Sequence, residues 1–226
     1  MDLERLLALL SNSSLYLCRL DRLRDPWEGL WPRPILEAIR SQLFAHKDIG
    51  GQDTFATFLA RDLPKTFFVS CWHENMTESA AFWDQYGNSR GLAIRSAIGR
   101  LKECSRSEMN FFIGRVKYLD YDHPVSVGMQ LDNMMSPAFL KRRSFEHERE
   151  VRVLQWHIVS PEGPVDFSKA HESSELRVDL AVLIESIYIS PMSPVWLVDA
   201  LQQLLTRFGL PGVHVRRSEL YDRTIA

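Results

Sequence analysis

Cysteine and long apolar runs are both scarce in this sequence. The 226 residues include three cysteines, Cys18, Cys71 and Cys104, and none has CxxC spacing. An odd, scattered set does not predict a disulfide framework, and a reducing cytoplasm fits it best. The longest leucine-rich stretch, residues 6–10, is too short for the core of a signal peptide and follows acidic residues. No apolar run approaches the roughly 18 residues of a membrane span, so we expect no membrane partner.

Charge of one sign and nucleotide-binding glycine motifs are also lacking. The formal net charge is -2, which argues against strong nonspecific attraction to nucleic acid or to an anionic membrane. Neither GxGxxG nor GxxxxGK[ST] occurs, so a Rossmann or P-loop site is not supported. Histidine and cysteine do not stand at the spacing of a zinc site, so we expect no metal.

What the sequence does have is enough apolar material for one substantial core. With 45% hydrophobic residues, a chain of this length is expected to form a single domain over residues 1–226. Apolar alternation predicts strands at residues 15–19, 65–72, 91–95, 112–119, 150–156, 183–190 and 213–217. Helical spacing predicts helices at residues 2–10, 34–46, 78–86 and 125–145, and a further helix from Pro194 to Phe208.

The C-terminal part reads as a strand–helix–strand unit. Ser193 is an apt N-cap, Pro194 suits the first helical position, and Gly209 suits the C′ position that closes the helix. We therefore expect an α+β fold in which a mixed central sheet is surrounded by helices.

The first candidate site lies where the strand at 65–72 ends. Ser70 and Trp72 share one face of that strand, and the helix that follows carries Phe82, Trp83 and Tyr86. Aromatic side chains here can stack a base or a nicotinamide, or they can be core, and helical spacing favours core for Phe82 and Trp83. Tyr86 precedes glycine at a helix end, so its hydroxyl is better placed to face a cleft.

The second candidate site is the acidic entry to the strand at 150–156. If Glu148 and Glu150 are both extended, their side chains point the same way about 7 Å apart. Two close carboxylates can separate in pKa, and an ionised one can stabilise positive charge at an anomeric carbon. The alternative is a salt-bridged strand entry, in which both glutamates pair locally with Arg149 and Arg152.

A third possibility is thiol chemistry at Cys71. Cys71 and His73 are two residues apart, so on a strand they face the same side, and such a pair can make a thiolate nucleophile for a hydrolase. The alternative is a buried structural cysteine beside a loop histidine.

These motifs together resemble the prokaryotic and phage family called domain of unknown function 2971. The resemblance runs over nearly the whole chain. It is carried by the following segments: 15–17, 25–29, 70–75, Glu78-Ser79 with Trp83, 91–94, 114–118, and Lys141-Arg142 with Phe145, Glu148, Glu150 and Arg152.

The order of parts is also similar, more distantly, to the ADP-ribosyltransferase fold. That similarity implies that NAD is the substrate, that Glu150 holds the nicotinamide ribose, and that Glu148 orients or deprotonates the acceptor. Ser70, Trp72 and Tyr86 would line the NAD cleft. Relatives open with an Arg-Tyr strand just before the segment matching Met1, so Arg19 would have to supply the first NAD contact here.

The resemblance therefore implies a cytoplasmic ADP-ribosyltransferase-like enzyme, an effector in phage defence or in a toxin–antitoxin system. Its partners would be a nucleotide-like small molecule and a protein acceptor. The alternative is a noncatalytic module that recognises a nucleotide or a peptide in the same cleft. A thiol hydrolase that uses Cys71 is the weaker alternative.

Overall fold

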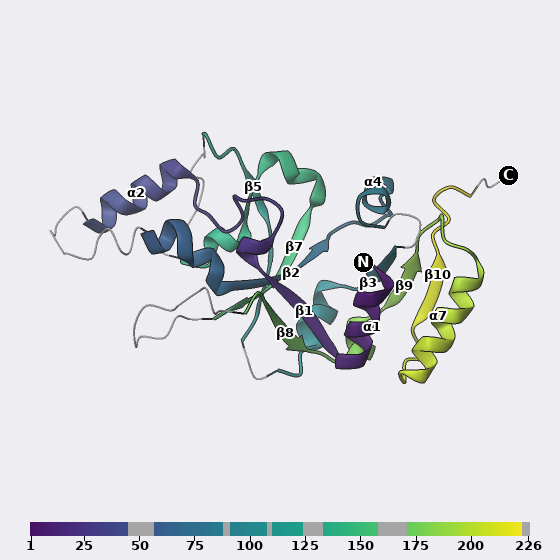
Figure 1. Cartoon of the computed structure of the whole chain (residues 1–226). Helices are drawn as coiled ribbons and strands as arrows, with labels where there is room; N and C mark the ends of the chain where they lie inside the picture. The colour runs from purple at the N-terminus through teal and green to yellow at the C-terminus, as the bar shows by residue number, and fades with distance from the viewer. Residues whose placement is uncertain (45–56, 88–90, 108–109, 124–132, 158–170, 223–226) are drawn as a thin grey trace. The chain divides into compact units, whose positions relative to one another are not determined.

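The computed structural model describes residues 1–44, 57–87, 91–107, 110–123, 133–157 and 171–222 (Figure 1). The chain divides into two compact units, each built from separated segments. The first unit comprises Met1–Tyr16, Asn75–Glu108 and Glu175–Ala226, and the second comprises Leu17–Glu74 and Met109–Ser174. A single domain over residues 1–226 stays a prediction.

The first unit is built on a three-stranded sheet of order β10-β9-β3. Strand β9 pairs in parallel with β10 and antiparallel with β3. The elements are α1 Leu3–Asn12, α4 Ala80–Phe82, the π-helical turn η4 Trp83–Gly87, β3 Leu92–Arg95, α5 Ile98–Glu103, α6 Leu180–Leu183, β9 Ser186–Ile189, α7 Trp196–Arg207 and β10 His214–Arg217. In Figure 1, α7 lies alongside β10, as the strand–helix–strand unit predicted from the sequence requires.

Local capping explains where the helices of this unit begin and end. The Asp2 side chain accepts a hydrogen bond from Arg5 N at 2.8 Å and starts α1, which ends at Ser13 in the left-handed region (φ 47°). Gly209 adopts φ 76° after α7, as predicted for a C′ glycine. The predicted cap at Ser193 is wrong: α7 begins later, after Val195, and no side chain caps it.

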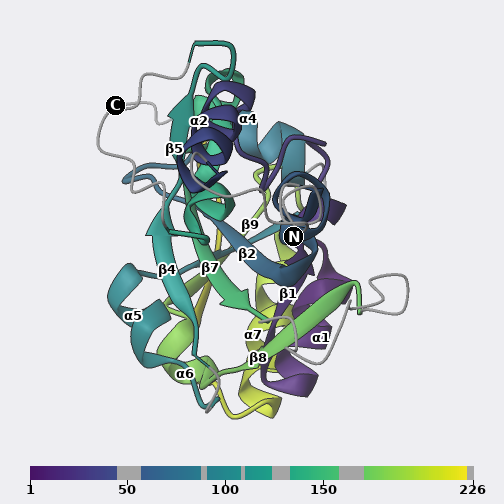
Figure 2. The same cartoon turned by 90° about the vertical axis from the view of Figure 1, so that its left-hand side faces the viewer.

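The second unit is built on the central strands of a five-stranded sheet of order β4-β7-β2-β1-β8. Figure 2 shows β4, β7 and β2 side by side in that order. The strands are β1 Ser14–Arg19, β2 Phe67–His73, β4 Phe112–Arg115, β7 Glu150–Trp156 and β8 Ser173–Arg177, and β1 and β8 each run from one unit into the other. A further parallel pair joins β5 Lys117–Leu119 and β6 Leu140–Arg142. The helical elements are η1 Leu20–Arg22, α2 Arg33–Phe44, η2 Phe58–Asp62, η3 Leu63–Thr66, η6 Ser136–Phe139 and η7 Arg143–Glu148.

The register of β2 against β7 decides which side chains share a face of this sheet. Cys71 lies opposite Arg152 and His73 opposite Glu150, whereas Ser70 lies opposite Val153. Directly opposed residues of an antiparallel pair project to the same side, and neighbours along a strand alternate. Glu150 and Arg152 therefore share one face with Cys71, and Ser70 projects from the other.

The hydrophobic core of the second unit covers the first of these faces. Its buried members are Leu20, Trp31, Ile35, Ile39, Leu59, Leu63, Phe67, Val69, Leu119, Ala138, Leu140 and Leu154. Along β7 the same face changes from apolar Leu154 to charged Arg152, which is fully buried. The apolar core therefore passes directly into a region of buried charge.

The α+β class is confirmed, and several details of the prediction are corrected. The described strands form three sheets rather than one mixed sheet. The predicted strand at 112–119 is two strands, β4 and β5. The helix predicted at 125–145 is wrong where the structure describes it, because the segment contains the short turns η6 and η7 and strand β6; residues 125–132 lie outside the described residues. Within the described ranges, no helix has the length and apolarity to cross a membrane.

Candidate functional site

Five charged side chains gather on the core face of the second unit, and we call them the charge cluster: Glu28, Lys141, Glu148, Glu150 and Arg152. They come from distant parts of the chain. Glu28 follows the turn at Asp25, Lys141 lies in β6, Glu148 ends η7, and the other two lie in β7. None exposes more than 9% of its surface. Buried charges require partners, so their contacts decide what the site can do.

Lys141 is the cation that the three carboxylates of the cluster share. Its Nζ lies 3.0 Å from Glu28 Oε1 and 3.2 Å from Glu150 Oε2. It also pairs closely with Glu148 Oε2. The ammonium group has three hydrogens, and these three carboxylates match them.

Arg152, which lies in strand β7, donates hydrogen bonds to two carboxylates of the cluster. Its Nε donates to Glu150 Oε1 at 2.8 Å, and one terminal nitrogen donates to Glu150 Oε2 at 3.0 Å and to Glu28 Oε2 at 2.6 Å. The other terminal nitrogen donates to the Ala138 carbonyl at 2.6 Å. Both oxygens of Glu150 are therefore engaged by cations.

The backbone at Arg149 places the two neighbouring glutamates on the same lysine. Arg149 has φ 41° and ψ 54°, which is left-handed and unusual for a residue with a Cβ. Glu148 before it ends a 3-10 helix, and Glu150 after it starts a strand. The extended geometry predicted for this pair is wrong, because the left-handed residue, rather than strand alternation, directs both carboxylates to Lys141.

Burial and the neighbouring charges act in opposite directions on the pKa values of Glu150 and Lys141. Burial alone would raise the pKa of Glu150, but the charges of Arg152 and Lys141 outweigh it and lower this pKa to about 2. Burial alone would lower the pKa of Lys141, but the carboxylates of Glu150 and Glu28 raise it above its ordinary value. Three carboxylates and two cations leave a formal charge of -1.

Cys71 and two tyrosines surround the cluster. The Cys71 residue is exposed as a whole, but burial of its thiol, followed by the charge of Glu150, raises its pKa. Tyr118 Oη accepts a hydrogen bond from Glu150 N at 2.8 Å. Burial, and next the charge of Glu28, raises the pKa of Tyr121. A thiolate at Cys71 is thus disfavoured near neutral pH, which counts against the thiol hydrolase.

His73 has a structural partner of its own. Its Nδ1 lies 2.6 Å from the Glu148 carbonyl oxygen, which can only accept, so Nδ1 carries the hydrogen. This bond ties the end of β2 to the turn that precedes β7.

A second ion pair flanks the cluster. Asp25 is buried, and both of its carboxylate oxygens accept hydrogen bonds from Arg142, at 2.7 and 3.2 Å. Asp25 Oδ1 also accepts from Trp27 N at 3.2 Å, so this aspartate stabilises its turn. The Arg142 guanidinium lies 6.0 Å from the Trp27 ring and 5.4 Å from the Phe145 ring.

Three of the four residues predicted to bind NAD lie on a different face of the sheet from the predicted catalytic Glu150. Ser70, Trp72 and Arg19 share the face of the sheet opposite to Glu150, as the pairing of Arg19 with Phe68 and of Ser70 with Val153 requires. Arg19 is buried, and its Nε donates to Asp21 Oδ1 at 2.6 Å. Tyr86, half-exposed, belongs to the first unit. The roles assigned to these residues stay predictions.

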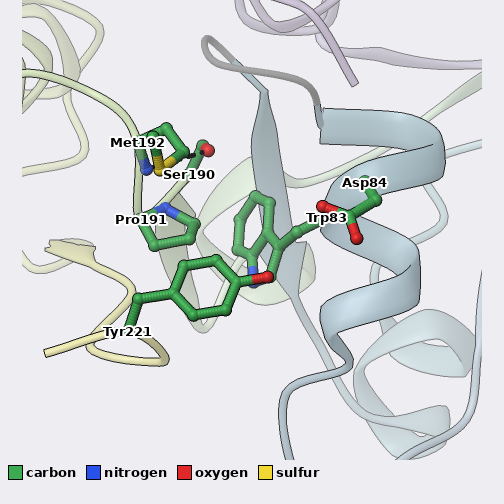
Figure 3. Close-up of a pocket in the computed structure, with 6 residues that line it drawn as sticks. All are labelled: Trp83, Asp84, Ser190, Pro191, Met192 and Tyr221. Atoms are coloured by element: carbon green, nitrogen blue, oxygen red, sulfur yellow. Dashed lines mark hydrogen bonds between the residues drawn. The ribbon is translucent and has the colours of Figure 1, made fainter.

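The first unit contains a separate small hollow of about 150 Å³ (Figure 3). It is lined by Trp83, Asp84, Ser190, Pro191, Met192 and Tyr221. Figure 3 shows Pro191 and Met192 on one side of the Trp83 indole and Asp84 on the other. The prediction that Trp83 is core is partly fulfilled, because its side chain is 8% exposed, yet its ring also forms a wall of this hollow.

Sequence reasoning missed Glu28 and Lys141 as cluster members and missed the hollow. A signal for the first was present, because both residues stand in the short motifs at 25–29 and 141–142 that carry the family resemblance. Tyr221 is an isolated aromatic near the C-terminus, and nothing around it in the sequence points to a site. The local pairing of Glu150 with Arg152, the alternative to catalysis, is what the structure shows.

Comparison of the chain with protein-family models, with curated proteins and with solved structures found no match. The resemblance to domain of unknown function 2971 and to the ADP-ribosyltransferase fold therefore stays a prediction. Among the described residues, no group of three histidine, cysteine or acidic side chains is arranged to hold a metal ion.

Proposed function

We propose that this chain is a noncatalytic recognition protein that binds a peptide segment of another protein. The observation that carries the proposal is the state of Glu150: both carboxylate oxygens bind Arg152 or Lys141, and the residue is 5% exposed. A carboxylate that must stabilise a reacting sugar needs an oxygen directed at the substrate. Glu150 instead serves as a structural anchor of the second unit.

The size of the hollow also favours recognition over cofactor chemistry. Pockets for cofactors and drug-sized ligands enclose about 300–1,000 Å³. The hollow in the first unit encloses about 150 Å³, which suits a single side chain. Several bulky apolar residues next to it in sequence are largely exposed: Met192 by 67%, Val195 by 71% and Trp196 by 67%. Exposed apolar groups of this kind are typical of protein-binding surfaces.

Panning a phage library of random peptides against the immobilised protein tests the proposal. We expect enriched peptides to bind the wild type and Glu150→Gln alike, provided that the variant is folded by circular dichroism. Trp196→Gln should weaken binding, whereas Trp27→Gln, which alters an exposed tryptophan of the second unit, should not. Failure to enrich any peptide, or equal binding by Trp196→Gln, would contradict the proposal.

The second candidate is the ADP-ribosyltransferase-like enzyme, in which nicotinamide leaves NAD and ADP-ribose passes to a protein acceptor or to water. It is favoured by one observation, the direct pairing of β2, which bears Ser70, with β7, which begins at Glu150. Incubation with NAD separates the two candidates. Nicotinamide release by the wild type that Glu150→Gln abolishes would establish the enzyme and refute the recognition protein.

A further inference from the structure

The hollow of the first unit has walls that other side chains hold in place. Trp83 Nε1 donates to Glu78 Oε2 at 2.9 Å, which fixes the rotation of the indole. The indole also lies against Gly87, where a Cβ would come within 2.6 Å of Trp83 Cε3. This wall is therefore formed before any ligand arrives.

Arg217 links the part of the hollow that contains Pro191 to the part that contains Tyr221. One terminal nitrogen donates to the Pro191 carbonyl at 2.6 Å, and the other pairs with the Asp222 carboxylate at 3.1 Å. Pro191 lines the hollow itself, and Asp222 directly follows the lining residue Tyr221. A single guanidinium thus sets the spacing between the proline and the tyrosine.

Among the described residues, the lining carries one formal charge, the carboxylate of Asp84. Its other members are Trp83, Tyr221, Ser190, Pro191 and Met192. Among the described residues, no ion pair of Asp84 is found, and no lysine or arginine lines the hollow. A hollow lined by a carboxylate and by the rings of a tryptophan and a tyrosine has the chemistry that selects a cation.

We propose that this hollow binds the side chain of a lysine or arginine projecting from a basic peptide segment of a partner protein. The proposal rests on the peptide recognition proposed above and names the residue that is recognised. The cation would lie against Trp83 and Tyr221, with its charge compensated by Asp84. Exposed Met192, Val195 and Trp196 would contact the residues that flank it.

Titration with side-chain surrogates tests the site directly. The probes are n-butylammonium chloride for lysine, ethylguanidinium chloride for arginine, and n-butanol as the uncharged control. The readout is the ¹H–¹⁵N cross-peak of the Trp83 indole. We expect the two cations to shift this peak with millimolar dissociation constants and n-butanol to bind at least about fivefold more weakly, because a partly exposed ion pair and a cation–π contact each contribute modestly.

Two variants and one matched control sharpen the result. Asp84→Asn should weaken both cations about fivefold and leave n-butanol unchanged, and Tyr221→Leu should weaken the cations while it keeps an apolar wall. Asp199→Asn removes an exposed carboxylate of α7 outside the lining and should change nothing. Equal binding of n-butanol and n-butylammonium, or wild-type affinity in Asp84→Asn, would overturn the cation site.

The cation site can be refuted without refuting the proposed peptide recognition. Peptides that enrich in panning but contain no lysine or arginine would overturn this inference and leave peptide recognition intact. NAD turnover would refute the recognition protein whether or not the surrogates bind.

Discussion

Replacing Lys141 by methionine tests whether the charge cluster stabilises the second unit. Methionine keeps most of the lysine stem but removes the charge that Glu28, Glu148 and Glu150 share. Breaking a buried ion pair by removing one partner costs about 3–5 kcal/mol, because the remaining charge stays buried without compensation. The fall in the pKa of Glu150 from 4.5 to about 2 corresponds to about 3 kcal/mol of favourable interaction, shared between Arg152 and Lys141.

We therefore expect Lys141→Met to lower the free energy of unfolding by about 3 kcal/mol at neutral pH. The difference from the wild type should shrink as the pH falls toward 4, because the uncompensated carboxyl groups of the variant take up protons. Urea unfolding followed by tryptophan fluorescence, repeated across this range, measures both effects.

Arg33→Met is the matched control for this measurement. Arg33 pairs with Glu37 on the surface of α2, and their side chains are 87% and 63% exposed. Such a pair contributes about 0.3–0.5 kcal/mol, so its loss should be barely detectable. A Lys141→Met variant that loses no more than Arg33→Met, with the pH dependence of the wild type, would refute the claim that Lys141 compensates buried charge.

Further predictions concern titration and backbone geometry. The folded pKa of Glu150, about 2, lies below its ordinary 4.5, so the stability it provides is complete above pH 4.5 and is lost as the pH falls to 2; Glu150→Gln should flatten this loss in urea titrations. Iodoacetamide should alkylate Cys71 more slowly than a peptide thiol at pH 8, and faster in Glu150→Gln, as peptide mass spectrometry would show; equal rates would contradict the raised pKa. Arg149→Gly should stabilise the fold by about 0.5–1 kcal/mol and Arg149→Val should destabilise it, because φ is 41° there; thermal unfolding checks the order of the three proteins. Gly209→Ala should cost about 1 kcal/mol at φ 76°, whereas Gly212→Ala, with open space around it, should cost less.

The sequence predicted correctly those elements whose conformation depends on neighbouring residues in the chain. Strand β7 was predicted residue for residue from its run of valine, leucine and tryptophan, in which polar residues alternate with apolar ones as far as Val153. The end of α7 was predicted because glycine adopts the left-handed conformation at low cost. The helix at 125–145 failed where it is described, because Pro137 falls in a 3-10 turn and Leu140–Arg142 pairs with β5 instead.

The candidate site depends on contacts that no local pattern contains. Strand alternation predicted that Ser70 and Trp72 share a face, but only the register between β2 and β7 shows that Glu150 occupies the other face. The proximity of Glu148 and Glu150 was predicted for the wrong reason, because it depends on the left-handed Arg149. Glu28 joins them through a hydrogen bond that spans 124 residues of chain.

The assembly order of the charge cluster follows from these separations along the chain. Lys141, Glu148, Glu150 and Arg152 lie within twelve positions and are able to meet as soon as the β6–β7 segment collapses. Glu28 arrives from a remote segment, and closing that long loop carries an entropic penalty that the local contacts do not. Until Glu28 docks, Arg152 lacks one of its hydrogen-bond acceptors. We therefore expect the Asp25–Glu28 turn to dock late in the folding of the second unit.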